Sequence, residues 1–401
     1  MTTNAALALS SAEVDAATLS IVEVATTDKK RLKQFIAFPR TIYPKDSAWV
    51  SPLDLERQMA FDRKKNPFFQ HADAAFFLCV RKDAQGNETI VGRISAQIDH
   101  EHTRIHNDGA GFYGNFDAID DARVAKILFD TAEAWLKAKG MKIMRGPYTM
   151  NINEECGVQI DAYDEIPMFL TAYNTPYYKT LVEGAGFHKV KELYSWRYRK
   201  EYVVPESAKR IGDRARSNPK IKVRPIDMKN FEVEVRTGLG IFNAAWKDNW
   251  GFVPLTEPEM KKAAEDLKLI IDPRIILIAE YEGKPAGMAL TVPNINEVIR
   301  PLRGKMFPFG WVSLLWNTKV KRPKRCRLTL LGVHPDFRGI RAGGGLAIAL
   351  CQEVFERCVA AGYEEAELSW TLDDNVGINN VIKAMGGQLY KTHYVYDRAI
   401  A

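Results

Sequence analysis

The stretch LGVHPDFRGIRAGGGLAIAL, residues 331–350, indicates a strand, a glycine-rich loop and a helix in direct succession. A short apolar run ends at Val333, the loop carries Arg338, Arg341 and a glycine triplet, and an apolar helix-forming run follows. The first turn of a helix presents backbone N–H groups without intrahelical partners and the positive end of the helix dipole. Bare backbone and fixed positive charge at that place indicate a binding site for an anion such as a phosphate.

Two well-known nucleotide-binding loops do not fit this stretch. The phosphate loop of many nucleotide-hydrolysing proteins reads GxxxxGK[ST], and no Lys-Ser or Lys-Thr pair follows these glycines. The dinucleotide fingerprint reads GxGxxG, and GGGLAI (343–348) has an isoleucine where the last glycine is required.

The loop resembles the pyrophosphate loop of the GNAT acyltransferase superfamily, which reads V-x-P-x-x-R-G-x-G-x-G before an apolar helix. Val333, Pro335, Arg338, Gly339 and Gly343 fall in register with it. An arginine at 341 replaces the middle glycine, which is unfavourable if the backbone there is left-handed but offers a further phosphate contact. The resemblance implies acyl-CoA as co-substrate and no permanently bound cofactor. The coenzyme-binding residues that it implies are Leu331, Val333, Arg338, Gly339, Arg341, Gly343, Gly344, Gly345 and Asn375.

The chain predicts the same α+β unit twice. Strand–turn–strand patterns occur at 74–99 and 274–292. An amphipathic helix that ends on glycine follows later in each half, at 122–140 and 345–362. The spacing agrees, since 12 positions separate Leu128 from Gly140, Leu350 from Gly362, Asn174 from Gly186 and Asn375 from Gly387. With the resemblance, this predicts a mixed α+β fold of two tandem GNAT-like units, each a twisted mixed sheet flanked by helices.

The start of the first of these helices differs from the glycine loop. Asp117, Asp120 and Asp121 precede it, and carboxylates at a helix start cap the helix and repel a diphosphate. We therefore expect only the C-terminal unit to bind acyl-CoA. The predicted organisation is a mobile tail at 1–18, an N-terminal unit without a cofactor loop at 19–200, a charged, proline-containing linker at 201–224 and a C-terminal unit at 225–401.

The catalytic residues are harder to assign. GNAT enzymes move an acyl group from a thioester to an amine, so the amine must lose a proton and the departing thiolate must be protonated or stabilised. The tyrosine that often serves as the acid in this fold is absent, and Tyr394 is one of three later tyrosines that are candidate substitutes. For the base, Glu367 lies in a strand-like segment, with a solvated strand residue as the alternative. Glu154 and Glu155 lie in an insertion at 151–168 without a counterpart in the second unit, with a surface loop as the alternative.

The segment FNAAWKDNWGFVPLT (242–256) occupies the region that overhangs the acceptor cleft in GNAT folds. Trp246 and Trp250 lie at i, i+4 on one helical face, with Asn243 and Asn249 nearby. We predict that these four residues bind the acceptor, and an aromatic core patch is the alternative.

A second unusual segment is RPLRGKMFPFGWVSLLWNTKVKRPKRCR, residues 300–327. Its eleven mostly apolar residues, 306–316, are flanked by Lys and Arg on both sides and are too few to cross a bilayer, which takes about 20. The pattern is typical of the interface of an anionic membrane or the mouth of a lipid-chain channel. Burial against the other unit is the alternative. Nucleic acid is not an expected partner, because a patch that binds it would interleave basic and aromatic residues.

The composition is that of an ordinary globular protein in a reducing compartment. The 401 residues are 46% hydrophobic and 26% charged, with a net charge of +6. The five scattered cysteines form no CxxC pair, so neither a disulfide framework nor a metal site is indicated. No Lys or Arg precedes Lys29, unlike in a secretory signal. We expect a cytoplasmic protein with peripheral contact at the inner membrane.

The whole chain also resembles the bacterial ceramide synthases, GNAT-like proteins of about this length. The matching pieces are the glycine loop, FPRTIYPKDSAWVSPL (38–53), INEECG (152–157) and FNAAWKDNWGFVP (242–254). This resemblance implies transfer of a fatty acyl group from acyl-CoA to the amine of a sphingoid base, a lipid acceptor. Two alternatives stay open: an acetyl-CoA-dependent N-acetyltransferase acting on an amino acid, peptide or polyamine, and a non-catalytic acyl-CoA-binding module.

Overall fold

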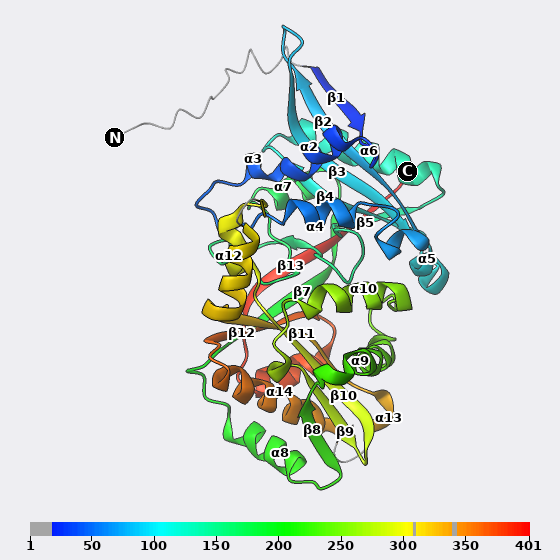
Figure 1. The fold of residues 1–401 in the computed structure, drawn as a ribbon. Coiled ribbons are helices and arrows are strands. Elements are labelled where there is room, and N and C mark those ends of the chain that lie inside the picture. The colour runs from blue at the N-terminus through cyan, green and yellow to red at the C-terminus, as the bar shows by residue number, and fades with distance from the viewer. Residues whose placement is uncertain (1–17, 308–309, 339–342) are drawn as a thin grey trace.

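The computed structural model describes residues 18–307, 310–338 and 343–401. Within these residues, thirteen strands form one sheet that runs through both halves of the chain (Figure 1). Along the sheet the order is β1-β2-β3-β4-β5-β13-β7-β12-β11-β10-β9-β8, and β6 pairs with β13 off this path. Helices flank the sheet in both halves, so the predicted mixed α+β fold is confirmed.

The elements of the first half follow the predicted order of hairpin, helix and strand. Their bounds are β1 Thr18–Glu23, α2 Lys29–Ala37, α3 Pro39–Ile42, α4 Asp54–Ala60, η1 Pro67–Gln70, β2 Ala72–Lys82, β3 Glu88–Asp99, α5 His100–His106, β4 Ala110–Ala118, α6 Ala122–Ala138, β5 Ile143–Gly146, β6 Val158–Gln159, α7 Tyr178–Gly184 and β7 His188–Arg199.

The second half repeats this order with a longer excursion between its hairpin and its parallel strands. The bounds are α8 Glu206–Arg216, β8 Ile221–Pro225, η2 Met228–Asn230, α9 Phe231–Trp246, α10 Glu257–Lys268, η3 Pro273–Ile275, β9 Leu277–Tyr281, β10 Lys284–Pro293, α11 Asn296–Ile299, η4 Arg300–Leu302, α12 Gly310–Trp316, η5 Asn317–Lys321, β11 Arg325–Val333, α13 Pro335–Arg338, α14 Gly343–Ala360, β12 Glu365–Leu372, α15 Val376–Ala384 and β13 Gln388–Ala399.

The last strands of the two halves are exchanged. Strand β13, at the end of the chain, pairs with β5 of the first half, with Tyr396 opposite Gly146. Strand β7, which ends the first half, pairs with β12 of the second half, with Trp196 opposite Leu368. The exchanged strands also pair with each other along most of their length, so they join the two halves into one sheet.

The segment 201–224, expected as a linker, differs from that expectation because it holds helix α8 and most of strand β8. Helix α8 packs closely on α14, because small residues face it: a Cβ at Gly212 would lie 1.8 Å from Gln352 Oε1, and a Cβ at Gly345 would lie 3.1 Å from that of Ala215. Strand β8 pairs with β9 at the edge of the sheet. The unit boundaries at 200 and 225 stay predictions, as does the tail, of which only residue 18 is described.

Each half has its own apolar core under a long helix. In the first half α6 buries Leu128, Phe129 and Leu136 completely, against β2, β3 and β4. In the second half α14 buries Ala349 and Leu350 in the same way. None of the helices among the described residues combines the length and the apolar character that crossing a bilayer requires.

Candidate functional site

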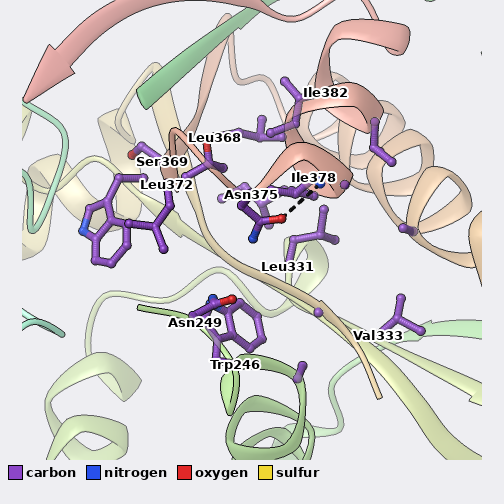
Figure 2. A pocket seen from close by; sticks show the side chains of 18 of the residues that line it. Trp246, Asn249, Leu331, Val333, Leu368, Ser369, Leu372, Asn375, Ile378 and Ile382 are labelled. Atoms are coloured by element: carbon purple, nitrogen blue, oxygen red, sulfur yellow. Dashed lines mark hydrogen bonds between the residues drawn. The ribbon is translucent and has the colours of Figure 1, made fainter. Parts of the chain in front are cut away.

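The main cavity of the second half lies where the parallel strands β11 and β12 separate. They pair only from Arg325 opposite Glu365 to Leu328 opposite Leu368, whereas the strands run on to Val333 and Leu372. We call the diverging ends the C-terminal fork. A cavity of about 390 Å³ opens there, between the end of α9 and the start of α15 (Figure 2). Parallel strands that separate in this way leave backbone groups of both strands available to an extended ligand.

The fork gathers six of the residues expected to bind coenzyme or acceptor. Figure 2 shows Trp246 and Asn249 across the cavity from Asn375, whose side chain accepts a hydrogen bond from the N–H of Ile378 at 3.4 Å. This bond caps α15. The six residues are Trp246, Asn249, Leu331, Val333, Arg338 and Asn375. Their roles in binding stay predictions.

Trp246 lies directly on strand β11 because that strand has a glycine beneath it. A Cβ at Gly332 would lie 2.3 Å from a ring carbon of Trp246. Arg338 fixes the same junction, since its Nε donates to the carbonyl of Val333 at 3.0 Å and its Nη2 donates to the carbonyl of Ala245 at 2.6 Å. The guanidinium expected to bind phosphate therefore also ties the end of β11 to the last turn of α9.

A β-bulge sits at the opening of the fork. Leu330 and Leu328 of β11 face the consecutive residues Leu290 and Thr291 of β10, so Thr329 is the extra residue on β11. Thr329 is one of the residues that line the cavity, and its hydroxyl oxygen is buried without a hydrogen-bond partner among the described residues. Bulges of this kind occur beside active sites, where they re-aim a side chain. The bulge thus leaves an unpaired hydroxyl group next to the cavity.

Sequence reasoning missed Thr329 and Asp248. Asp248 is the one carboxylate among the described residues that line the cavity, and it is exposed to solvent. A signal for Asp248 was present, because it lies between Trp246 and Asn249 in the segment already assigned to the acceptor. No sequence signal marked Thr329, because a bulge depends on the pairing of two strands.

Glu367 is fully buried and does not line the cavity. It accepts hydrogen bonds from the hydroxyls of Ser369 and Tyr390 and, at 3.1 Å, from Lys391 Nζ. Burial by itself raises the pKa of this carboxyl, but the charges of Lys391 and Arg327 outweigh it and lower the pKa to about 2. A carboxylate held ionised in this way is a poor acceptor for the proton of an amine. The geometry therefore favours a structural role, and the solvated alternative is wrong.

The other catalytic candidates lie away from the cavity lining. Glu155 accepts from Arg57 Nη2 at 2.7 Å and from Thr149 Oγ1 at 3.1 Å, which holds it in the first half. Tyr394 pairs with Val158 of β6, and Lys189 Nζ lies 4.6 Å from the centre of its ring.

Glu154 differs from these because its carboxyl has an unusual pKa. Burial and the neighbouring charge of Glu155 raise the pKa to about 7, although Arg57 opposes them. The loop that carries it contacts the acceptor segment of the second half, where Asn153 Nδ2 donates to the carbonyl of Val253 at 3.4 Å. Glu154 can therefore exchange a proton near neutral pH.

The remaining predicted residues contribute less to the cavity. Trp250 packs beside the guanidinium of Arg145, and the side-chain oxygen of Asn243 is buried without a partner among the described residues. Neither of these two lines the cavity. Gly343 and Gly344 begin α14, Gly345 faces α8, and Gly339 and Arg341 lie outside the described residues.

The corresponding place in the first half is much narrower, with a cavity of about 110 Å³ against about 390 Å³ in the second half. Strands β4 and β5 pair from Ala110 to Phe112 and then separate, forming the N-terminal fork. The chain after β5 enters this fork, where the N–H of Tyr148 donates to the carbonyl of Tyr113 at 2.8 Å and Asn115 Nδ2 donates to the carbonyl of Thr149 at 2.8 Å. A Cβ at Gly114 would lie 1.6 Å from the carbonyl oxygen of Tyr148. Backbone thus occupies part of the space that is open in the second half and leaves only the smaller cavity beside it.

The start of the first long helix is also occupied. Only residues 119–121 join β4 to α6, whereas residues 334–342 separate β11 from α14. The carboxylate of Asp121 accepts from the N–H of Arg123 at 2.9 Å and caps α6, as expected. Asp117 is instead buried, and it accepts from Arg93 Nε at 2.8 Å and from the hydroxyl of Tyr178 at 2.9 Å.

Comparison with known proteins defines the class. Residues 241–386 match the model of the Acetyltransferase (GNAT) family. Two solved structures share the fold over nearly their whole length, each with a TM-score of 0.51. One is a GCN5-related N-acetyltransferase from Sphaerobacter thermophilus, 13% identical, covering 95% of this chain and 96% of that one. The other is a tandem GNAT protein from the clavulanic acid biosynthesis pathway, 12% identical, covering 96% of this chain and 99% of that one.

Two relatives match almost the entire chain. A protein named bacterial ceramide synthase, from Caulobacter vibrioides, is 38% identical over 386 residues, which is 96% of this chain and 98% of that protein. Protein YghO of Escherichia coli is 36% identical over 374 residues, 93% of this chain and 94% of that protein. The chain therefore belongs to the GNAT family, as an acyl-CoA-dependent N-acyltransferase with tandem GNAT-like units.

Proposed function

We propose that this protein transfers a fatty acyl group from acyl-CoA to the amine of a sphingoid base, and that the C-terminal fork is its active site. The observation that carries the proposal is the open cavity of about 390 Å³ between β11 and β12, in a chain whose other fork is entered by backbone and keeps a cavity of only about 110 Å³. The name of the relative from Caulobacter, which is 38% identical over nearly the whole chain, supports the choice of acceptor.

The coenzyme would enter the fork from the side of the glycine loop. The start of α14 then binds the diphosphate, together with the guanidinium at 338, because a helix start favours an anion. The apolar lining, with Leu331, Val333 and Ile378, suits the uncharged arm that carries the thioester.

The acceptor would approach past the segment 242–256. Trp246 and Asn249 offer an apolar surface and an amide, and Asp248 offers a carboxylate to an ammonium group. A protonated amine cannot attack a thioester, so a base must remove its proton. We propose Glu154 as that base: it does not itself line the cavity, but the neighbouring Asn153 contacts the acceptor segment, and a pKa of about 7 suits removal of a proton from an amine.

Donor competition tests this function. The purified protein is incubated with palmitoyl-CoA and acetyl-CoA together, with sphinganine or a panel of amino acids, peptides and polyamines, and the amides are identified by mass spectrometry. We expect N-palmitoyl sphinganine as the main product. Preference for acetyl-CoA with a polar amine would establish the acetyltransferase alternative. Tight acyl-CoA binding without turnover on any amine would establish the non-catalytic alternative.

A further inference from the structure

Helix α12 and the following π-helical turn η5 carry an apolar stripe on their outer face. The side chains of the stripe are each between 46% and 58% exposed: Trp311, Val312, Leu315, Trp316 and Val320. They recur at intervals of four residues along residues 310–321, so they lie on one side of the helix. Phe307, shortly before the helix, is 75% exposed.

The inner face of this helix fixes its orientation. Leu314 packs into an apolar cluster with Val50 and Val298, which anchors the helix to the first half and to α11. Asn317 Nδ2 donates to the carbonyl of Ser313 at 2.8 Å, so the polar side chains find partners within the helix. The arrangement is the reverse of an ordinary surface helix, which turns its apolar face inward. In Figure 1 this helix lies at the outer edge of the molecule, beside the first half.

Positive charge surrounds the stripe. Residues 298–335 contain no Asp or Glu, and their nine basic residues are Arg300, Arg303, Lys305, Lys319, Lys321, Arg322, Lys324, Arg325 and Arg327. The side chains of Lys305, Lys321 and Arg322 are exposed, and none of the three forms an ion pair with a described residue. Arg325 and Arg327, in contrast, are bound by Glu297 and by the backbone carbonyl of Phe169.

We propose that this stripe docks on the surface of an anionic lipid bilayer. Tryptophan and aliphatic side chains on one helical face, with Lys and Arg beside them, enter the boundary between headgroups and acyl chains, and the cations pair with headgroup phosphates. A second copy of the chain is a poorer occupant, because a symmetric contact would bring two cationic rims together. The docking goes beyond the proposed function, since it needs neither donor nor acceptor.

Vesicle binding tests the proposal with the full-length protein. Binding is measured by flotation with vesicles of phosphatidylglycerol and phosphatidylcholine in equal parts, and with vesicles of phosphatidylcholine alone. We expect binding to the anionic vesicles, and a loss of at least tenfold in the variant Trp316→Glu and in the double variant Lys321→Glu/Arg322→Glu. Val203→Glu is the matched control, because Val203 is 86% exposed and lies outside the stripe. Unchanged thermal unfolding in each variant shows that the fold is intact.

Two results would overturn the proposal. Equal binding of the wild type and of both stripe variants to anionic vesicles would show that another surface meets the lipid. A wild-type dimer in light scattering that Trp316→Glu dissociates, without vesicle binding, would show that a second copy covers the stripe. Failure of the donor competition leaves the docking result unaffected, so the two proposals fail separately.

Discussion

The N-terminal and C-terminal forks share one local arrangement but differ in three respects: the bulge residue, the space between the separating strands and the start of the following long helix. Both have a parallel strand pair that separates and a bulge on the strand that precedes a long helix. In the first half the bulge residue Asn115 binds the carbonyl of Thr149, and backbone narrows the fork to a cavity of about 110 Å³, whereas Thr329 in the second half lines a cavity of about 390 Å³. The comparison teaches that two units of one fold can differ in the space they offer a ligand, because one admits its own chain into the fork and caps the following helix with a carboxylate.

The largest expected effect is on turnover, and it comes from Glu154, a residue of the first half that we propose as the base of the active site in the second half. If Glu154 removes the proton of the acceptor, Glu154→Gln lowers kcat by about a hundredfold or more. In the wild type, kcat/KM with a soluble acceptor should rise with pH through about 7, the pKa of Glu154. Glu155→Gln is the companion variant and should shift this pH profile to lower pH without abolishing turnover, because the charge of Glu155 is one cause of the raised pKa of Glu154. A profile that keeps its shape in Glu154→Gln would remove Glu154 from the mechanism.

The same pKa gives a stability prediction with a definite sign. The folded state binds a proton at Glu154 up to about pH 7, whereas the unfolded chain loses it near the ordinary value of 4.5. The stabilisation linked to this proton is therefore present below about pH 4.5 and is lost as the pH rises through 7. We expect Glu154→Gln to lessen the fall of the melting temperature over this range, as measured by circular dichroism.

A pair of glycine substitutions tests the two forks against each other. Gly114→Ala places a Cβ on the backbone of Tyr148 and should lower the free energy of unfolding by about 3 kcal/mol or more. Gly332→Ala meets side-chain atoms, the Trp246 ring and the Cβ of Ala245, and no backbone, so it should cost about 1–2 kcal/mol of stability and should weaken acyl-CoA binding by displacing that ring. Denaturant titration and calorimetry check both. Weaker acyl-CoA binding by a folded Gly114→Ala protein would contradict the expectation that only the C-terminal fork takes part in binding.

Removing Arg338, the arginine before the glycine loop, should weaken the binding of acyl-CoA. Arg338→Ala loses the predicted phosphate contact and the bonds to the carbonyls of Val333 and Ala245, so affinity for acyl-CoA should fall by about 1.5–3 kcal/mol. Isothermal titration calorimetry measures the loss. An unchanged affinity would count against the assignment of the loop.

The smallest expected effect is on stability, and it comes from Asp121, which caps helix α6 in the first half. Asp121→Ala removes the acceptor for the N–H of Arg123 and should cost about 1 kcal/mol of stability, without changing acyl-CoA affinity. Thermal unfolding and the same titration measure the two effects. If the Asp121→Ala protein binds a second acyl-CoA per chain, then the charge of Asp121, and not the backbone inside the N-terminal fork, excludes the coenzyme from the first half.

The sequence predicted those features that depend on neighbours along the chain. The glycine loop, the duplicated hairpin and helix, and the capping carboxylate at 121 are local patterns, and the structure has each described part of them where it was expected. The cluster at 242–256 also pointed to the cavity, because two of its predicted residues, Trp246 and Asn249, line it.

Features set by distant pairing could not be predicted in this way. The exchange of β7 and β13 leaves the apolar pattern of either strand unchanged, because a strand buries the same face whichever neighbour it has. Glu367 reads as a polar strand residue, and its burial is explained by the charges of Lys391, 24 positions later in sequence, and of Arg327 on the neighbouring strand. The segment 201–224 reads as a linker because it is rich in charge and contains proline. Its contact with α14 depends on a few small residues of α8, which have no recognisable pattern in the sequence.

The most direct test of the central claim is a crystal structure of the complex with coenzyme A. The account predicts one molecule per chain, with its diphosphate at the start of α14 and its arm between β11 and β12. Coenzyme bound between β4 and β5, or outside both forks, would contradict it.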